Sequence, residues 1–191
     1  QEAFLREEVH LYAVTLSAEL SGSYNSAVLG KSLALEKHPE KKIHVFNSRS
    51  ASVGETLIAK KIAECEEKGM SFSRVVDTVE KYIDSQVTYF VLENLETLRK
   101  NGRLSKVKAF VASALKIKPV MGSTPEGTIC QLDQARGINK ALVKMVDYIV
   151  SGAENTENKV LAISHCNCRE RAEMVRDAIL EKIQVKDTIL L

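Results

Sequence analysis

Short runs of apolar residues alternate along the chain with longer stretches of helical periodicity. Five runs predict strands, at residues 9–16, 42–48, 87–95, 158–166 and 187–191. Several of these runs lack polar alternation, which is typical of strands that are buried on both faces of a sheet. The order of the elements therefore predicts an α/β fold with mainly parallel sheets and with helices packed on them.

The stretches between these runs carry apolar residues three or four positions apart, which places them on one face of a helix. The four stripes are Val75, Val79, Tyr82 and Ile83; Val107, Phe110, Val111 and Ala114; Ile138, Ala141, Leu142, Met145 and Ile149; and Ala172, Val175, Ile179 and Ile183. One segment departs from this alternation, because Gly127 follows Pro125 and Glu126 between two strand-like pieces. We expect an antiparallel hairpin there.

The composition narrows the classes of protein to which the chain can belong. Its 191 residues carry 27 lysines and arginines against 25 acidic residues, and this balance gives no reason to expect general nucleic-acid or membrane-surface binding. No apolar run reaches the ~20 residues that a membrane span needs, and the first ten residues lack the pattern of a signal peptide. The four cysteines show no spacing typical of a secreted disulfide scaffold. We therefore expect a cytoplasmic protein without disulfides.

A serine-rich segment follows the first predicted strand, where residues 15–27 read TLSAELSGSYNSA. Ser17, Ser21, Gly22 and Ser23 lie where this strand passes into a helix. Ligands of open α/β sheets bind beyond the carboxyl ends of the strands, where helix N-termini offer unpaired N–H groups. The segment is thus suited to hold a carboxylate, although an N-cap at Ser21 or Ser23 and a turn at Gly22 are the simpler explanation from these residues alone.

Two kinds of enzyme are alternatives to a binding protein. Residues 25–32, NSAVLGKS, match a phosphate loop except that Asn25 replaces its first glycine. Such a loop lies between a strand and a helix, whereas Gly30 and Lys31 are predicted to lie inside a helix. An ATP-dependent phosphotransferase therefore stays an alternative, as do a serine hydrolase with a nucleophile in the serine-rich segment and a small-molecule sensor that binds no lipid.

His165, Cys166 and Cys168 form a candidate set of metal ligands. A structural zinc ion takes four ligands, and no second pair of cysteine or histidine residues lies at a suitable spacing. We therefore expect neither a metal nor another cofactor.

Four segments carry a family resemblance. LSAELSGSYNSA is similar to the turn S-S-x-L-S-G-T-Y-x-S-A, and VFNSRSASVGE is similar to F-D-S-x-x-A-S-x-G. FVLENLETLRKNGRLS resembles F-x-[LV]-x-x-L-x-x-L-x-x-G-G-R-[IL], and LKIKPVM with EGTICQLDQARGINKAL resembles K-P-I…D-G-x-[IL]…x-x-R-x-x-x-K-A. In this order, these motifs resemble those of the DegV fatty-acid-binding proteins, which include the acyl-binding subunit of the bacterial fatty acid kinase.

The resemblance implies two α/β domains, residues 1–86 and 87–191, with the ligand between them. It also implies that the chain is incomplete at both ends, because family members carry a T-S-Q-P-S segment before this part and an H-x-G-P-G segment after it. Ala18 stands where the family has the second serine of its S-S pair. Ser17 is therefore the nearer candidate for contact with a carboxylate.

The function implied by the resemblance is that of a carrier and not of an enzyme. It would bind a long-chain fatty acid in an interdomain tunnel and present the carboxylate to a separate ATP-dependent kinase. Ser17, Ser21, Gly22 and Ser23 would hold the carboxylate. Each buried methylene contributes about 0.8 kcal/mol, so the tail supplies most of the affinity. The residues implied to line the tunnel are Phe110, Val111, Ala114 and Leu115, and the alternative is that they are ordinary core residues.

Arg103 and Arg136 each lie beside a glycine. The resemblance implies that they lie near the head group and the surface that meets the kinase. A guanidinium group binds phosphate or acyl phosphate through two parallel hydrogen bonds, which suits this role. The alternative is that both are ordinary surface arginines.

Overall fold

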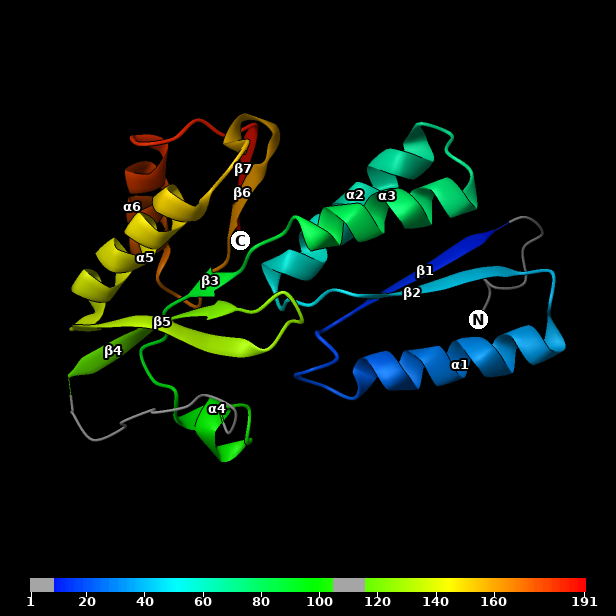
Figure 1. The fold of residues 1–191 in the computed structure, drawn as a ribbon, viewed down its shortest axis with the longest axis horizontal. Coiled ribbons are helices and arrows are strands. Elements are labelled where there is room, and N and C mark those ends of the chain that lie inside the picture. The colour runs from blue at the N-terminus through cyan, green and yellow to red at the C-terminus, as the bar shows by residue number, and fades with distance from the viewer. Residues whose placement is uncertain (1–8, 105–115) are drawn as a thin grey trace. The chain divides into compact units, whose positions relative to one another are not determined.

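The computed structural model describes residues 9–104 and 116–191, and the chain divides into two compact units. The first unit comprises residues 1–86 together with 125–128, and the second comprises residues 87–124 and 129–191. Figure 1 labels their helices and strands. The residues that were predicted to line a tunnel, Phe110, Val111, Ala114 and Leu115, lie outside the described residues, as does the rest of the stripe that begins at Val107.

In the described part of the first unit, strands β1 (His10–Thr15) and β2 (Lys42–Asn47) form a parallel pair. Helix α1 (Ser23–Lys37) connects them, because parallel neighbours need a long crossover connection. Helices α2 (Val53–Glu67) and α3 (Phe72–Asp84) follow β2 and lie on the face of the pair opposite α1 (Figure 1). The two predicted strands at 9–16 and 42–48 are thus confirmed.

The core of the first unit lies between the strand pair and the helices α2 and α3. Val75, Val79 and Ile83 are buried, which confirms the stripe predicted for this helix. They pack with buried residues of β2 and α2, namely Phe46, Ile58, Ile62 and Cys65. Burial of each valine, isoleucine or phenylalanine side chain stabilises the fold by about 1.5–3 kcal/mol, so this cluster holds α2 and α3 against the strand pair.

The second unit begins with an antiparallel sheet of β3 (Tyr89–Phe90), β4 (Ile117–Ser123) and β5 (Ile129–Arg136), in that order. The predicted hairpin is confirmed, since β4 and β5 pair antiparallel and Gly127 in their connection has a φ of 89°, which favours glycine. The predicted strand at 87–95 is wrong in its length. Strand β3 pairs with two residues of β4, and the chain then turns into the short helix α4 (Glu96–Lys100).

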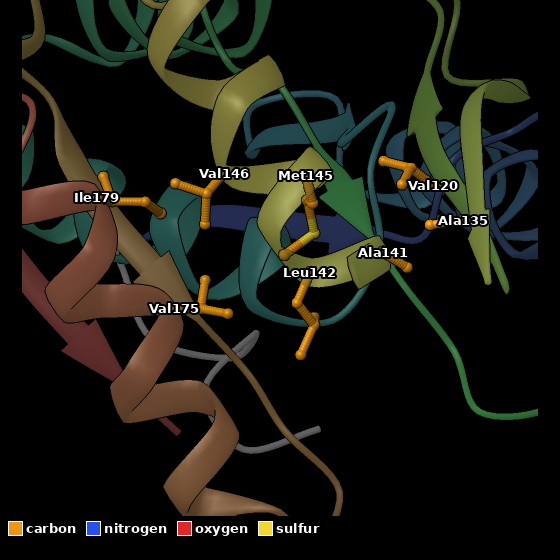
Figure 2. Packing of buried hydrophobic residues seen from close by; sticks show 8 residues of the cluster. All are labelled: Val120, Ala135, Ala141, Leu142, Met145, Val146, Val175 and Ile179. Carbon is orange, nitrogen blue, oxygen red and sulfur yellow. The ribbon is translucent and has the colours of Figure 1, made fainter. Parts of the chain in front are cut away.

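After β5 the chain forms helix α5 (Ile138–Gly152), which is followed by the 3₁₀ turn η2 (Thr156–Asn158). Strands β6 (Val160–Ile163) and β7 (Asp187–Leu190) form a parallel pair that helix α6 (Arg169–Leu180) connects. Figure 2 shows buried side chains from the hairpin, α5 and α6 that belong to one cluster: Val120, Ala135, Ala141, Leu142, Met145, Val146, Val175 and Ile179. The stripes predicted for both helices are confirmed, except that Ile183 lies beyond the end of α6.

The predicted α/β class is confirmed, because helices alternate with strands and, among the described residues, two of the three sheets are parallel pairs. Burial on both faces is confirmed for β2, where Ile43 and Val45 are buried on one face and Phe46 on the other. The same prediction is wrong for β1, β6 and β7, which are partly buried or exposed along most of their length. Each of these strands has one strand neighbour within the described residues.

Candidate ligand site at the carboxyl ends of β1 and β2

Four hydroxyl side chains are buried where the two parallel strands of the first unit end. Thr15 and Ser17 belong to the end of β1 and the residues after it, and Ser48 and Ser50 follow β2. Parallel strands bring their carboxyl ends to the same edge of a sheet, where open α/β proteins bind ligands. The four hydroxyls therefore gather at the edge at which a ligand site is expected.

Hydrogen bonds between the backbones join the two strand ends. The backbone N–H of Ser17 donates to the carbonyl oxygen of Ser50 at 2.9 Å, and that of Ser48 donates to the carbonyl oxygen of Thr15 at 3.2 Å. The hydroxyl of Ser48 donates to the Ser50 carbonyl at 3.1 Å. These bonds fix the path of both segments as they leave the sheet.

Asn47, the last residue of β2, holds the backbone on both sides of the edge. Its Oδ1 atom accepts hydrogen bonds from the backbone N–H of Ala18 at 3.0 Å and of Arg49 at 3.2 Å. The guanidinium group of Arg49 in turn pairs with Asp84 at the end of α3, at 2.7 Å. A single amide thus links the segment after β1 to the segment after β2.

The hydroxyl of Ser17 is fully buried and donates to the carbonyl oxygen of Gly127 at 2.8 Å. It also accepts a bond from the backbone N–H of Glu19 at 3.3 Å. A Cβ atom at Gly127 would lie 2.4 Å from Ser17 Oγ and 2.7 Å from Arg49 Cα, so the turn at residues 125–128 packs closely against the strand ends. Ser17 therefore anchors this turn to the segment that follows β1.

Two residues after β2 adopt backbone conformations that are uncommon outside glycine. Arg49 has a φ of 49°, and Ser52 has a φ of 55° with a ψ of −122°. Such conformations cost on the order of 1–3 kcal/mol each, and they cluster at binding and catalytic sites. Their position supports the assignment of this edge as a functional site.

The N-terminus of α1 has no side-chain cap. Its N-cap residue is Gly22, and the hydroxyl of Ser21 accepts a hydrogen bond from the backbone N–H of Ser23 at 3.2 Å. The expectation of an N-cap at Ser21 or Ser23 is therefore wrong, because the helix begins at Ser23 after Gly22. The first turn, which the structure describes in full, carries no acidic residue.

The N-terminus of α2 differs from that of α1. Ser52 is its N-cap, and the carboxylate of Glu55 accepts a hydrogen bond from the backbone N–H of Ser52 at 3.1 Å, as in a capping box. This helix thus places an anion of its own beside the positive end of its dipole. Helix α1 does not, and its first N–H groups can receive an external anion.

Arg103 and Arg136 belong to the second unit and are both exposed. Arg103 follows α4, and its guanidinium group donates to the carbonyl oxygen of Asn101 at 2.5 Å. Arg136 is the last residue of β5 and pairs in register with Ile117 of β4. The candidate carboxylate residues Ser17, Ser21, Gly22 and Ser23 all belong to the first unit.

The two segments that suggested ATP binding or metal binding were residues 25–32 and the group His165, Cys166 and Cys168. Gly30 and Lys31 lie within α1, as predicted. The Nδ1 atom of His165 accepts a hydrogen bond from the backbone N–H of Cys168 at 3.3 Å. Within residues 9–104 and 116–191, no group of three potential metal ligands gathers, and no helix is long and apolar enough to cross a membrane.

Sequence reasoning did not single out Asn47, Ser48, Ser50 or Gln86. The first three lie in the segment VFNSRSASVGE, where the family resemblance was a signal that could have found them. Gln86 lies after the end of α3 and belongs to no motif or stripe. Both polar atoms of its side-chain amide are buried and have no hydrogen-bond partner in the part of the chain that the structure describes.

Comparison with known proteins extends these observations. The DegV family model, described as "Uncharacterised protein, DegV family", matches residues 1–191. A DegV domain-containing protein of Streptococcus pneumoniae is 35% identical over 170 residues, which cover 88% of this chain and 60% of the relative. One from Clostridium perfringens is 28% identical over 189 residues, or 99% of this chain and 65% of the relative. The chain thus spans about 60–65% of the length of these curated relatives.

Two crystal structures are similar over the whole chain. A DegV family protein from Ruminococcus gnavus, refined with vaccenic acid, is 59% identical with a TM-score of 0.94, and 68% of its chain is covered. The fatty acid kinase (Fak) B3 protein of Streptococcus pneumoniae, loaded with linoleic acid, is 33% identical with a TM-score of 0.86, and 66% of its chain is covered. Together with the match of the family model to every residue, these similarities show that the chain belongs to the DegV family.

Proposed function

We propose that this protein binds a long-chain fatty acid and holds its carboxylate at the carboxyl ends of β1 and β2. The observation that carries the proposal is the buried hydroxyl cluster beside an α1 N-terminus that has no acidic residue of its own. The Ruminococcus gnavus relative with vaccenic acid and the Streptococcus pneumoniae relative with linoleic acid support a fatty acid as the ligand.

A carboxylate in a partly dehydrated site needs several hydrogen-bond donors, because an unpaired buried charge costs far more than the tail can offset. Ser21, Gly22 and Ser23 supply hydroxyls and backbone N–H groups at the start of α1, whose dipole favours an anion. Ser17 contributes in a different way, since its hydroxyl already donates to Gly127. We assign to Ser17 the role of keeping the turn at residues 125–128 in place beside the head group.

The hydrocarbon tail supplies most of the affinity. A dozen methylenes, each worth about 0.8 kcal/mol on burial, contribute roughly 10 kcal/mol before the costs of association. The course of this tail, including contacts with Phe110, Val111, Ala114 and Leu115, stays a prediction. The head group then sets orientation and specificity more than it sets affinity.

The protein acts, in this proposal, as a carrier that presents the carboxylate to a separate ATP-dependent kinase. The similarity to a fatty acid kinase (Fak) B3 protein supports such a partner. The position of Gly30 and Lys31 inside α1 argues against an ATP site of the phosphate-loop type in this segment. Arg103 and Arg136 are exposed and can contact the phosphate or the kinase.

The first test is extraction of the protein after expression in bacteria. Mass spectrometry of the denatured extract should find a long-chain fatty acid, and oleate or palmitate added to delipidated protein should raise its melting temperature. A wild-type protein that releases no fatty acid and whose melting temperature does not respond to either acid would refute the proposal.

The second test separates the binding of the lipid from its presentation. Arg103→Ala and Arg136→Ala should retain the fatty acid but slow its phosphorylation by the partner kinase about tenfold or more, because phosphate contacts matter at the transfer step. The control is Arg74→Ala, which changes an exposed arginine of α3. If the two variants lose lipid affinity and turnover in equal proportion, the arginines are ligands of the head group instead.

A further inference from the structure

Among the described residues, the buried side-chain nitrogen and oxygen atoms that lack a hydrogen-bond partner both belong to Gln86. Both its Nε2 and its Oε1 atom are buried, and neither has a partner among residues 9–104 and 116–191. Because both atoms are unpaired, the observation does not depend on which of the two is taken as the nitrogen. The amide can therefore offer both a donor and an acceptor to another molecule.

An amide in this state is costly to keep. More than nine in ten buried polar groups in folded proteins have a hydrogen-bond partner, and leaving one unpaired destabilises the folded state. An apolar side chain of similar size would avoid this cost. A glutamine at this position is thus better explained by a bound group that completes its hydrogen bonds than by packing.

The location of the amide connects it to the hydroxyl cluster. A Cβ atom at Gly54, in the first turn of α2, would lie 2.6 Å from Gln86 Nε2 and 2.2 Å from Ser50 Oγ. The amide of Gln86 and the hydroxyl of Ser50 therefore both lie next to the Cα atom of Gly54. They occupy the space that a larger side chain at residue 54 would fill. The carbonyl oxygen of Ser50 accepts the hydrogen bond from Ser17, so Gln86 adjoins the edge at which the head group is proposed to bind.

We propose that the side-chain amide of Gln86 hydrogen-bonds to the carboxyl group of the bound fatty acid, with Nε2 donating to a carboxyl oxygen. This inference rests on the proposed function. A carboxylate oxygen accepts this hydrogen bond, so the head group satisfies the buried donor of the amide. Gln86 is then a determinant of head-group specificity, contributed by the segment that follows α3 and not by the serine-rich segment.

The experiment compares Gln86→Met with Gln134→Met, which makes the same chemical change at an exposed position of β5. Delipidated proteins are titrated with oleate labelled with ¹³C either at the carboxyl carbon or at the terminal methyl carbon. In Gln86→Met, affinity should fall about tenfold and the bound carboxyl resonance should move, while the methyl resonance stays in place. Gln134→Met should match the wild type in all three readouts.

The stability of the ligand-free proteins provides an independent readout. Gln86→Met should unfold at the same or a higher urea concentration than the wild type, because the unpaired amide is gone. Should Gln86→Met fail to fold, Gln86→Asn is the second variant. Its side chain keeps the amide but is one methylene shorter, so the bound carboxyl resonance must move as expected for Gln86→Met.

Three results would overturn the inference while the proposed function stands: unchanged affinity, lower affinity with an unmoved carboxyl resonance, or movement of both resonances together. A wild-type protein that binds no oleate would instead refute the proposed function itself, and the inference with it. The two failures are therefore distinguishable in one set of titrations.

Discussion

The two ends of the β1–β2 pair are both polar, but their polar groups differ in kind. Towards the amino ends, ionisable side chains pair with one another: Tyr12 donates to Glu66 at 2.6 Å, His10 lies 2.8 Å from the same carboxylate, and His44 lies 3.2 Å from Glu80. At the carboxyl ends, the buried groups are hydroxyls, backbone amides and the side-chain amide of glutamine, and the Arg49–Asp84 ion pair lies nearer the surface.

The amino end shows how a polar cluster satisfies itself. Burial raises the pKa of Glu66, but the hydrogen bonds from Tyr12 and His10 outweigh it and hold the pKa of this carboxyl below its ordinary value. Burial and the hydrogen bond to Glu66 raise the pKa of the Tyr12 phenol. These shifts come from groups of the protein itself, so a perturbed pKa here indicates a structural cluster.

The carboxyl end retains hydrogen-bonding capacity that the described residues do not use. The amide of Gln86 is unpaired, and the N-terminus of α1 lacks an acidic residue. The comparison teaches that polarity and shifted pKa values do not distinguish the candidate ligand site from a structural cluster in this unit. Buried groups whose hydrogen bonds are incomplete within the described residues do distinguish it.

The largest expected effect comes from Gly127→Ala, which disrupts the packing of the turn at residues 125–128 against the carboxyl ends of β1 and β2. The new Cβ atom would collide with Ser17 Oγ and the backbone of Arg49, and alanine would have to adopt the φ of 89° that residue 127 has. Urea unfolding should therefore show a free energy of unfolding lower by about 3 kcal/mol or more. The control, Gly69→Ala, has a φ of 66° but nothing within 4 Å of the added atom, and should cost about 1 kcal/mol. Equal losses in the two variants would show that the turn does not pack on Ser17.

Ser17→Ala should have the next largest effect. It removes the hydroxyl that joins Gly127 and Glu19, and the buried carbonyl left unpaired should cost about 1–2 kcal/mol in the free energy of unfolding. Ser32→Ala is the matched control, since its hydroxyl also donates to a backbone carbonyl, at 3.2 Å, but at the exposed surface of α1. A Ser17→Ala protein as stable as this control would contradict the anchoring role.

Glu66→Gln tests the amino end through pH. Folding lowers the pKa of the Glu66 carboxyl below its ordinary value of 4.5. The ionised carboxylate therefore stabilises the protein when the pH is above 4.5, and this stabilisation is lost as the pH falls below 4.5 towards the lowered pKa. The wild type should therefore lose more stability between pH 6 and pH 3 than Glu66→Gln does, and Tyr12→Phe should be intermediate. Urea unfolding across this range is the measurement, and parallel curves for the wild type and Glu66→Gln would contradict the assignment.

The smallest effect is expected from Lys31→Ala, which alters neither end. Lys31 lies within α1, where alanine is a favourable helix residue, so the free energy of unfolding should change by less than about 0.5 kcal/mol. Calorimetric titration with ATP and Mg²⁺ should detect no binding to either protein. Magnesium-dependent ATP binding that disappears in the variant would favour the phosphotransferase alternative.

Local patterns in the sequence determined much of this fold. The stripes of α3, α5 and α6 were predictable, because helical periodicity is visible in the spacing of apolar residues. The turn at Gly127 was predictable because glycine readily adopts the positive φ that such a turn needs. The order of motifs also indicated the DegV family. The helical position of Lys31 was also predictable, because the first strand was expected to end near residue 16 and the helix to begin well before Lys31.

Only the tertiary structure decided how the polar groups of the site are used. The hydroxyl of Ser17 finds its partner 110 residues further along the chain, and the amide of Gln86 reaches the hydroxyl cluster from the end of a different helix. Neither relation leaves a periodic trace, because a hydrogen bond between distant segments depends on where packing of the core carries their backbones. The sequence determined which elements form in this protein, and the packing of those elements decided which side chains are satisfied and which remain available to a ligand.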